Sequence, residues 1–323
     1  MAVTYSLVDG AAHALAASEI LNDAWRPPAL HYTPEYMRWQ LTFPGPWPVP
    51  AVMAFNGSAP AGFAAATPRR VRYGGTHYDA VVLSFVCVRP EYQGQGIARG
   101  LYERLLAQLA GLGCLVITYT MPGSAGDRVL RRAYPDAGFA MHAIGEYAVH
   151  ARMVKSAAPG VLAYVAEDVS VLRDCIEQCA KQDAMIHSDP SDAQLQHYMH
   201  DPRPRWLVIA VNESQGVTGA AWAIRSDMRG PNGRDTILTL DSVFVPRNRA
   251  EALPPLFDMA GEVLNVGSKG PVVVAAPSLT GFSMADLRAV GIRKTASSFV
   301  GFVCAPSLPE GLDRAEGTTL EVI

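Results

Sequence analysis

The sequence predicts an α/β protein made of two tandem copies of one mixed-sheet fold. In the first half of the 323-residue chain, strands alternate with amphipathic helices, most clearly where apolar strand 83–88 runs through a glycine-containing turn into a helix. The second half repeats this order at an offset near 157 positions. A chain of this length suits two domains, because each copy is long enough to bury its own core.

The repeat defines the expected domains. The breaker-rich stretch 155–160 predicts the linker, so we expect domains at 1–155 and 160–323. Four pairs of segments correspond: 33–39 with 191–197, Gly62 with Gly219, 83–88 with 240–245, and 137–139 with 290–292.

Further elements of the first half follow in a clear order. Apolar spacing predicts a helix over about 97–111, which a Gly-Leu-Gly turn ends. A β-branched strand over 114–120 comes next, followed by a helix over about 124–134. Gly138 and Phe139 then enter another strand. The order predicts a sheet with crossover helices on its face.

The turn before helix 97–111 predicts a phosphate site. Backbone N–H groups at a helix start lack partners, and the helix dipole favours negative charge there. The dinucleotide motif G-x-G-x-x-G does not fit, because Arg99 holds its third glycine position and Gly100 comes one residue late. A P-loop does not fit either, since no Lys-Ser or Lys-Thr follows Gly96. Residues 93–98 instead match [Q/R]-x-x-G-x-[G/A] throughout.

Residues 93–98, Gln-Gly-Gln-Gly-Ile-Ala, resemble the pyrophosphate-binding motif of the GCN5-related N-acetyltransferase (GNAT) family. A second motif lies downstream, where 134–139, Tyr-Pro-Asp-Ala-Gly-Phe, resembles the Y-x-x-x-G-F of the same family. The elements between the two motifs are those of the family, and the resemblance covers about 1–153. It implies a strongly bent mixed sheet in each half, an acyl-coenzyme A donor, and direct attack by an amine on the thioester.

The resemblance also implies which residues form the donor site. The strand before the turn is expected to splay from its neighbour, pair with the pantetheine arm and polarise the thioester carbonyl. Asp127 occupies the place of a cofactor-contacting asparagine. The expected pantetheine contacts are Val86, Cys87 and Val88; the expected pyrophosphate contacts are Gln93, Gly94, Gln95, Gly96, Ile97 and Ala98.

Tyr134 is the predicted general acid for the departing thiolate, the alternative being a tyrosine that only packs in the core. Pro135 disfavours helical backbone at Tyr134 and so affects the aim of its hydroxyl. The general base is missing, because Ser84 and its neighbours on the strand carry no carboxylate. The open alternatives are a water chain, His77, Asp79, a residue from elsewhere, or an acceptor that binds deprotonated. Cys87 is expected to be inert packing.

The second half is expected to have lost the donor site. Its turn, 246–255, holds no glycine, and Leu287 stands where the tyrosine would be. A scaffolding or acceptor-shaping role is therefore predicted for this half. Asp241 aligns with Ser84, and we expect structural hydrogen bonding from it. The aromatic-rich stretch 25–47 is expected either to line the acceptor side or to form one apolar helix face.

Composition narrows the function. With 27 Lys and Arg against 30 Asp and Glu, nothing indicates nucleic acid or an anionic membrane. No apolar run has membrane-spanning length, and the N-terminus does not resemble a signal peptide, so we expect a cytoplasmic protein. Cys175 and Cys179 have helical spacing and are expected in the core, with no metal. The predicted activity is acetyl transfer from acetyl-CoA to a small-molecule or peptide amine by a monomer or homodimer. An acyl-CoA-binding regulatory protein without turnover is the alternative.

Overall fold

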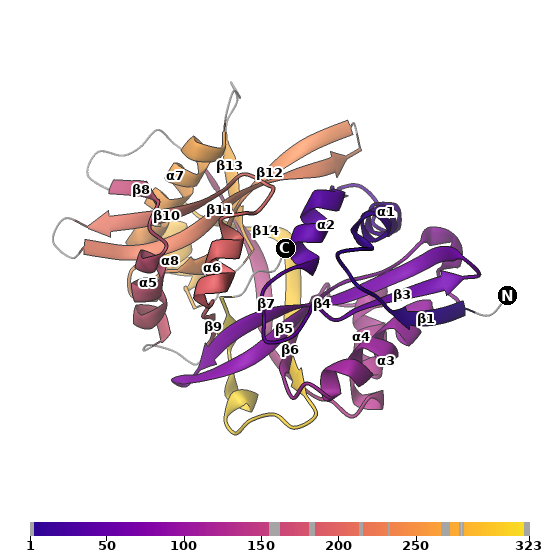
Figure 1. Cartoon of the computed structure of the whole chain (residues 1–323). Helices are drawn as coiled ribbons and strands as arrows, with labels where there is room; N and C mark the ends of the chain where they lie inside the picture. The colour runs from indigo at the N-terminus through magenta and orange to yellow at the C-terminus, as the bar shows by residue number, and fades with distance from the viewer. Residues whose placement is uncertain are drawn as a thin grey trace.

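The computed structural model describes residues 3–154, 162–180, 185–212, 216–231, 233–265, 272–277, 279 and 281–319, and its strands and helices run twice through the same order (Figure 1). The first half contains β1 (Val3–Leu7), α1 (Ala14–Ala24), β2 (Ala29–Leu30), α2 (Pro34–Leu41), β3 (Ala51–Asn56), β4 (Ala59–Tyr73), β5 (Thr76–Val88), η1 (Pro90–Tyr92), α3 (Ile97–Ala110), β6 (Leu115–Thr120), α4 (Ala125–Asp136) and β7 (Ala140–Met153). The second half contains β8 (Leu162–Ala166), α5 (Ser170–Ala180), β9 (Met185–Ser188), α6 (Asp192–Tyr198), β10 (Arg205–Asn212), β11 (Gly216–Gly230), β12 (Gly233–Phe244), η2 (Ala250–Ala252), α7 (Leu253–Leu264), β13 (Val273–Ala276), α8 (Met284–Ala289), β14 (Arg293–Ala305), η3 (Leu312–Arg314) and β15 (Gly317–Thr318).

The halves are copies of each other, and the predicted tandem fold is confirmed. Helices α1 to α4 correspond to α5 to α8, strands β3–β5 to β10–β12, and β6 to β13. A rare backbone feature repeats as well: Phe85 has φ 63° and Ser242, 157 positions later, has φ 48°. Each lies at a register shift against the preceding strand. Positive φ is uncommon outside glycine, so the same outlier at the same place marks a shared fold.

The two halves exchange their last strands. The sheet runs β1-β3-β4-β5-β6-β14-β7-β13-β12-β11-β10-β8. Strand β14, from the end of the chain, pairs with β6 of the first half, while the far end of β7 pairs with β13 of the second. Figure 1 shows these two long strands crossing the middle of the molecule. The predicted linker 155–160 lies outside the described residues, and the limits 1–155 and 160–323 stay a prediction.

Helices cover each half on one face, and the other faces meet in a shared core. Helices α3 and α4 cover the first half through residues such as Leu105 and Leu130, and α7 covers the second through residues such as Phe257. The shared core takes aromatic residues from both halves: Trp39, Phe43 and Phe85 from the first, and Tyr198, Trp222 and Phe244 from the second. The apolar face predicted for 25–47 belongs to this core. In the described part, no helix has the length and apolarity needed to cross a membrane.

The expectation that Pro135 disfavours helix at Tyr134 was wrong. Helix α4 continues through Pro135 to Asp136. The proline lies in the last turn, where it removes one backbone hydrogen bond. Closing bonds compensate, because the Phe139 N–H donates to Tyr134 O at 2.9 Å and the Gly138 N–H to Pro135 O at 2.9 Å. The same closure recurs after α8, where the Ile292 N–H donates to Leu287 O.

Candidate active site

Strands β5 and β6 separate in the middle of the first half. They pair in parallel from Ala80 with Leu115 to Leu83 with Thr118, and the pairing ends there. The bulge at Phe85 follows immediately on β5. Val86, Cys87 and Val88 therefore lie on a strand whose edge toward β6 has no neighbouring strand. An unpaired strand edge offers alternating N–H and C=O groups to an extended ligand chain.

A single 3-10 turn, η1, connects this strand to the predicted phosphate cradle. Gly94 and Gly96 have φ of 77° and 79°, and a Cβ at either position would meet nothing within 4 Å. Among the described residues, the N–H groups of 94–99 make no backbone hydrogen bond, whereas Gln93 donates to Pro90 O and Gly100 to Gly96 O. Gly96 is the N-cap of α3, so these donors meet the positive end of a helix dipole. The cradle has the geometry of an anion site.

Side-chain hydrogen bonds support the loop that forms the cradle. The Gln93 Nε2 donates to Val88 O at 3.0 Å, and the Gln95 Nε2 to Glu91 O at 3.4 Å. Ile97 is buried, and Ala98 packs against the same core. Gly100 is needed for packing and not for the cradle, because a Cβ there would lie 2.3 Å from the Tyr5 ring. The close packing of β1 on α3 thus explains the glycine that stands one residue too late for a dinucleotide motif.

Tyr134 is fully buried next to the point where β5 and β6 separate. Its ring packs against Tyr102 and Phe139, with ring centroids 6.0 Å and 5.9 Å away. Burial raises the pKa of Tyr134 well above its usual range, and interaction with the Thr118 side chain opposes this shift only in part. Thr118 is the last β6 residue paired with β5, so the hydroxyl lies next to the point where the strands part. The Tyr134 hydroxyl therefore stays protonated at neutral pH and can donate a hydrogen bond or a proton.

Asp127 lies at the start of α4, and its carboxylate binds the backbone of the loop that precedes this helix. One carboxylate oxygen accepts the Gly123 N–H at 3.1 Å, and the other accepts from Arg131 Nε at 2.9 Å. The Asp127 N–H in turn donates to the Ser124 hydroxyl. The carboxylate thus orders the loop after β6, and its contact with a cofactor stays a prediction.

His77 and Asp79 do not lie near the separated strands. Both stand at the far end of β5, and six residues of strand between Asp79 and Phe85 span roughly 20 Å. The His77 Nδ1 is 2.5 Å from the Asp189 carboxylate of the second half. Cys87 is buried, and burial above all raises the pKa of its thiol, so it is not a nucleophile. Cys175 and Cys179 are likewise buried in the shared core.

The second half has no equivalent cradle. Its turn leads through η2 into α7, whose N-cap is Ala252, and Pro254 and Pro255 fill the first turn. No described residue of 246–255 has positive φ. Leu287 is buried where the first half has Tyr134. Among the described residues, an unpaired strand edge followed by a glycine turn at a helix start therefore occurs in the first half and not at the equivalent place in the second. In the described part, no three His, Cys, Asp or Glu side chains gather in a form that could hold a metal ion.

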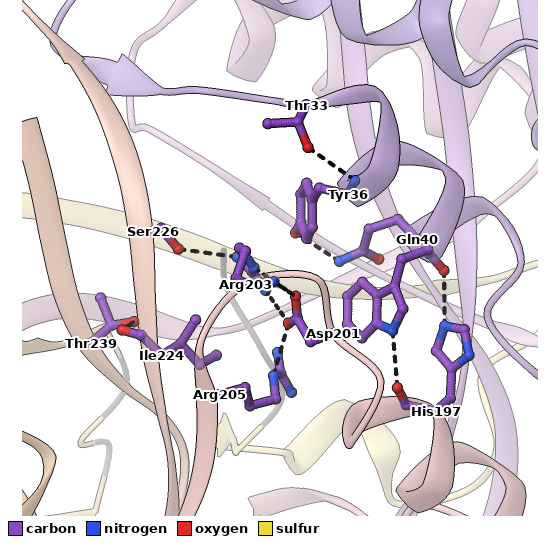
Figure 2. Close-up of polar contacts among 11 residues, drawn as sticks. Thr33, Tyr36, Gln40, His197, Asp201, Arg203, Arg205, Ile224, Ser226 and Thr239 are labelled. Carbon is purple, nitrogen blue, oxygen red and sulfur yellow. Dashed lines mark hydrogen bonds and ion pairs between the residues drawn. The ribbon is translucent and has the colours of Figure 1, made fainter. Parts of the chain in front are cut away.

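The aromatic face of α2 meets the second half in a buried polar network that the sequence analysis did not foresee (Figure 2). Trp39 Nε1 donates to His197 O at 2.9 Å, and His197 Nε2 lies 2.9 Å from Trp39 O. The Arg203 guanidinium stacks 4.1 Å over the Tyr36 ring. The only sequence signal for this network is the Asp-Pro-Arg-Pro-Arg run at 201–205. Its charged residues stand at every second position, which suits one carboxylate paired with two arginines.

Asp201 holds this network together. Its carboxylate accepts from Arg203 Nη2 at 2.8 Å and from Arg205 Nε at 2.9 Å, and the side chain is 0% exposed. Burial favours the neutral acid, but Arg205 and Arg203 outweigh it and lower the pKa of Asp201. Arg203 also donates to Ser226 at 3.2 Å. The network thus joins α2 of the first half to α6 and β11 of the second.

Comparisons with known proteins agree with this geometry. Residues 14–139 match the model of the acetyltransferase (GNAT) family. Among solved structures, the fold resembles Saccharomyces cerevisiae N-myristoyltransferase with bound myristoyl-CoA, with a TM-score of 0.69 and 11% identity over 99% of this chain and 89% of that one. It also resembles a tandem GNAT protein from the clavulanic acid biosynthesis pathway, with a TM-score of 0.60 and 12% identity over 96% of this chain and 100% of that one.

A GCN5-related N-acetyltransferase from Anabaena variabilis is similar too, with a TM-score of 0.56 and 14% identity over 94% of this chain and 72% of that one. No curated protein sequence gives a significant match. The family match covers β5, the cradle, α3, β6 and α4, which are the elements that form the site. The chain therefore has a tandem GNAT-like fold, and residues 14–139 of its first half match the GNAT family model.

Proposed function

We propose that the first half transfers an acetyl group from acetyl-CoA to a primary amine of a small molecule or peptide. One observation carries the proposal: the unpaired edge of β5 is followed, after the single 3-10 turn η1, by the cradle at Gly94 and Gly96. An extended thiol-terminated arm with a pyrophosphate at its other end fits this path. The match of residues 14–139 to the acetyltransferase (GNAT) family model supports an acyl-CoA donor and, among acyl groups, the acetyl group.

The proposed chemistry is direct transfer. The amine nitrogen attacks the thioester carbonyl carbon, whose oxygen takes a hydrogen bond from an N–H of β5 at the bulge. The C–S bond then breaks, and the departing thiolate accepts a hydrogen bond and a proton from the Tyr134 hydroxyl. The high pKa of Tyr134 supports this role, since it keeps the hydroxyl protonated at neutral pH.

Two measurements test the proposal. Calorimetry with CoA and acetyl-CoA measures donor binding, and a thiol-detecting assay with a panel of amines measures CoA release. Amine-dependent release that yields an acetylated amine supports the proposal. Binding of acetyl-CoA without release for any amine would favour a regulatory acyl-CoA-binding protein, and the lack of any binding would refute both.

A further inference from the structure

No carboxylate lies at the separated end of β5, the strand that carries the expected thioester contacts. Ser84 is half-buried there, directly before the bulge at Phe85. His77 and Asp79 lie at the far end of the same strand. An amine acceptor is an ammonium ion at neutral pH, so one proton must leave it before attack.

The equivalent position of the second half does carry a carboxylate. Asp241, 157 positions after Ser84, is buried directly before the corresponding bulge at Ser242. Its Oδ1 accepts the Ser242 N–H at 3.0 Å, which fixes the carboxylate against its own strand. Asp241 pairs across the sheet with Trp222, so both side chains stand on one face.

That face looks toward the first half. Trp222 is fully buried in the shared core, and its ring lies 5.6 Å from that of Tyr198. Phe85 and Cys87 of β5 enter the same core. Ser84 pairs with Ala65, another member of this core, so Ser84 and Asp241 face the space between the halves. The two equivalent strand positions thus face the same shared core.

Tyr119 connects Asp241 to the separated strands. It is the first β6 residue beyond the pairing with β5. Burial is the main cause of the raised pKa of Tyr119; the Asp241 charge raises it further, while Thr318 and Arg69 lower it. The carboxylate therefore lies within electrostatic reach of the place where β5 and β6 part. It approaches from the face opposite Tyr134, whose ring belongs to the core under α3 and α4.

We propose that Asp241, supplied by the second half, accepts the proton from the ammonium group of the acceptor in the reaction of the first half. The inference rests on the proposed acyl transfer. One N–H proton passes to the Asp241 carboxylate, and the freed lone pair forms the C–N bond. The C–S bond breaks, and the thiolate takes a proton from Tyr134. The product nitrogen gives its second proton to the Tyr134 phenolate, and Asp241 releases its proton to solvent, so both side chains return to their starting states.

The charged groups on the elements around Asp241 come from both halves. Tyr119 on β6 interacts electrostatically with both Asp241 and Arg69 of β4, and in the second half the Arg205 guanidinium lies 5.5 Å from the ring centroid of Trp222, the residue that pairs with Asp241. Asp201 neutralises part of the Arg205 charge.

The test compares Asp241→Asn with Asp235→Asn, an exposed aspartate on the same strand. We expect Asp241→Asn to lower kcat/KM at pH 7 by about 10²- to 10⁴-fold. Its CoA affinity stays within about twofold of wild type, because the cradle lies elsewhere. The loss shrinks as pH approaches the pKa of the acceptor amine, since a deprotonated amine needs no base. A residue that only supports the fold would not show this recovery at high pH.

A second variant keeps Asp241 intact. Ser84→Asp adds a second carboxylate at the equivalent position facing the shared core, and we expect it to raise the pKa of the pair and to move the acidic limb of the rate profile upward by about one pH unit. The pH–rate profile of Ser84→Asp tests the role of Asp241 even if Asp241→Asn fails to fold. An unmoved limb in Ser84→Asp, or an unchanged rate in a folded Asp241→Asn, overturns the role of Asp241 alone. Failure of the wild-type protein to bind CoA overturns the acyl transfer and this inference together.

Discussion

Replacement of Gly96 by alanine tests the phosphate cradle most directly. Gly96 has φ 79°, a region that costs an L-residue about 1 to 2 kcal/mol. Its Cβ would meet no protein atom within 4 Å, so the structure offers no clash to add to this cost. The new methyl group would instead project into the open side of the turn, where the N–H groups of 94–99 converge.

The expected effect on CoA binding follows from these contacts. A hydrogen bond to a charged group is worth about 1.5 to 3 kcal/mol, so displacement of one phosphate contact weakens CoA binding about 10- to 100-fold. Isothermal titration with CoA measures the affinity, and thermal unfolding measures the stability.

Gly113→Ala is the matched control. Gly113 has φ 65° and equally open surroundings, but it lies beyond the opposite end of α3, about 21 Å from the cradle. Both variants should lose similar stability, and only Gly96→Ala should lose CoA affinity. Wild-type affinity in Gly96→Ala, or equal losses of affinity in both variants, would refute the cradle.

Three further predictions concern the acid, the buried network and the exchanged strands. Tyr134→Phe should lower kcat at least tenfold with little change in CoA affinity, whereas Tyr102→Phe, its buried neighbour, should leave kcat near wild type; equal rates in both would show that the thiolate is protonated elsewhere. Asp201→Asn should lower the free energy of unfolding in urea by about 3 to 5 kcal/mol, against at most about 1 for Asp192→Asn, whose side chain is 91% exposed beside Arg173. Because the folded pKa of Asp201 is lowered, its contribution is present above the unfolded pKa of about 3.9 and is lost as pH falls through the folded pKa, so the gap between wild type and variant should narrow in acid. A fragment of residues 1–155 lacks β14 and should neither unfold cooperatively by circular dichroism nor bind CoA; a fragment with full-chain CoA affinity would contradict the dependence of the first half on that strand.

Local features of the fold could be predicted because their causes are local. The cradle follows from two glycines with positive φ at a helix N-terminus, and neither requirement depends on distant residues. The helix over 97–111 and the strand over 114–120 are confirmed to within a residue as Ile97–Ala110 and Leu115–Thr120. The expectation about Pro135 failed because the bonds that close α4 come from the residues after it.

The sequence by itself determined that the chain is a duplicated GNAT-like fold whose donor features survive in one half. Only the tertiary structure decided how the halves combine. Strands β7 and β14 exchange partners, Asp201 holds two arginines against the aromatic face of α2, and Asp241 faces the half that lacks its counterpart. The physical reason is the range of the interactions. Hydrogen bonds within a turn follow from neighbouring residues, whereas strand exchange and core sharing join segments about 150 residues apart, and no local pattern records which edge or face each will meet.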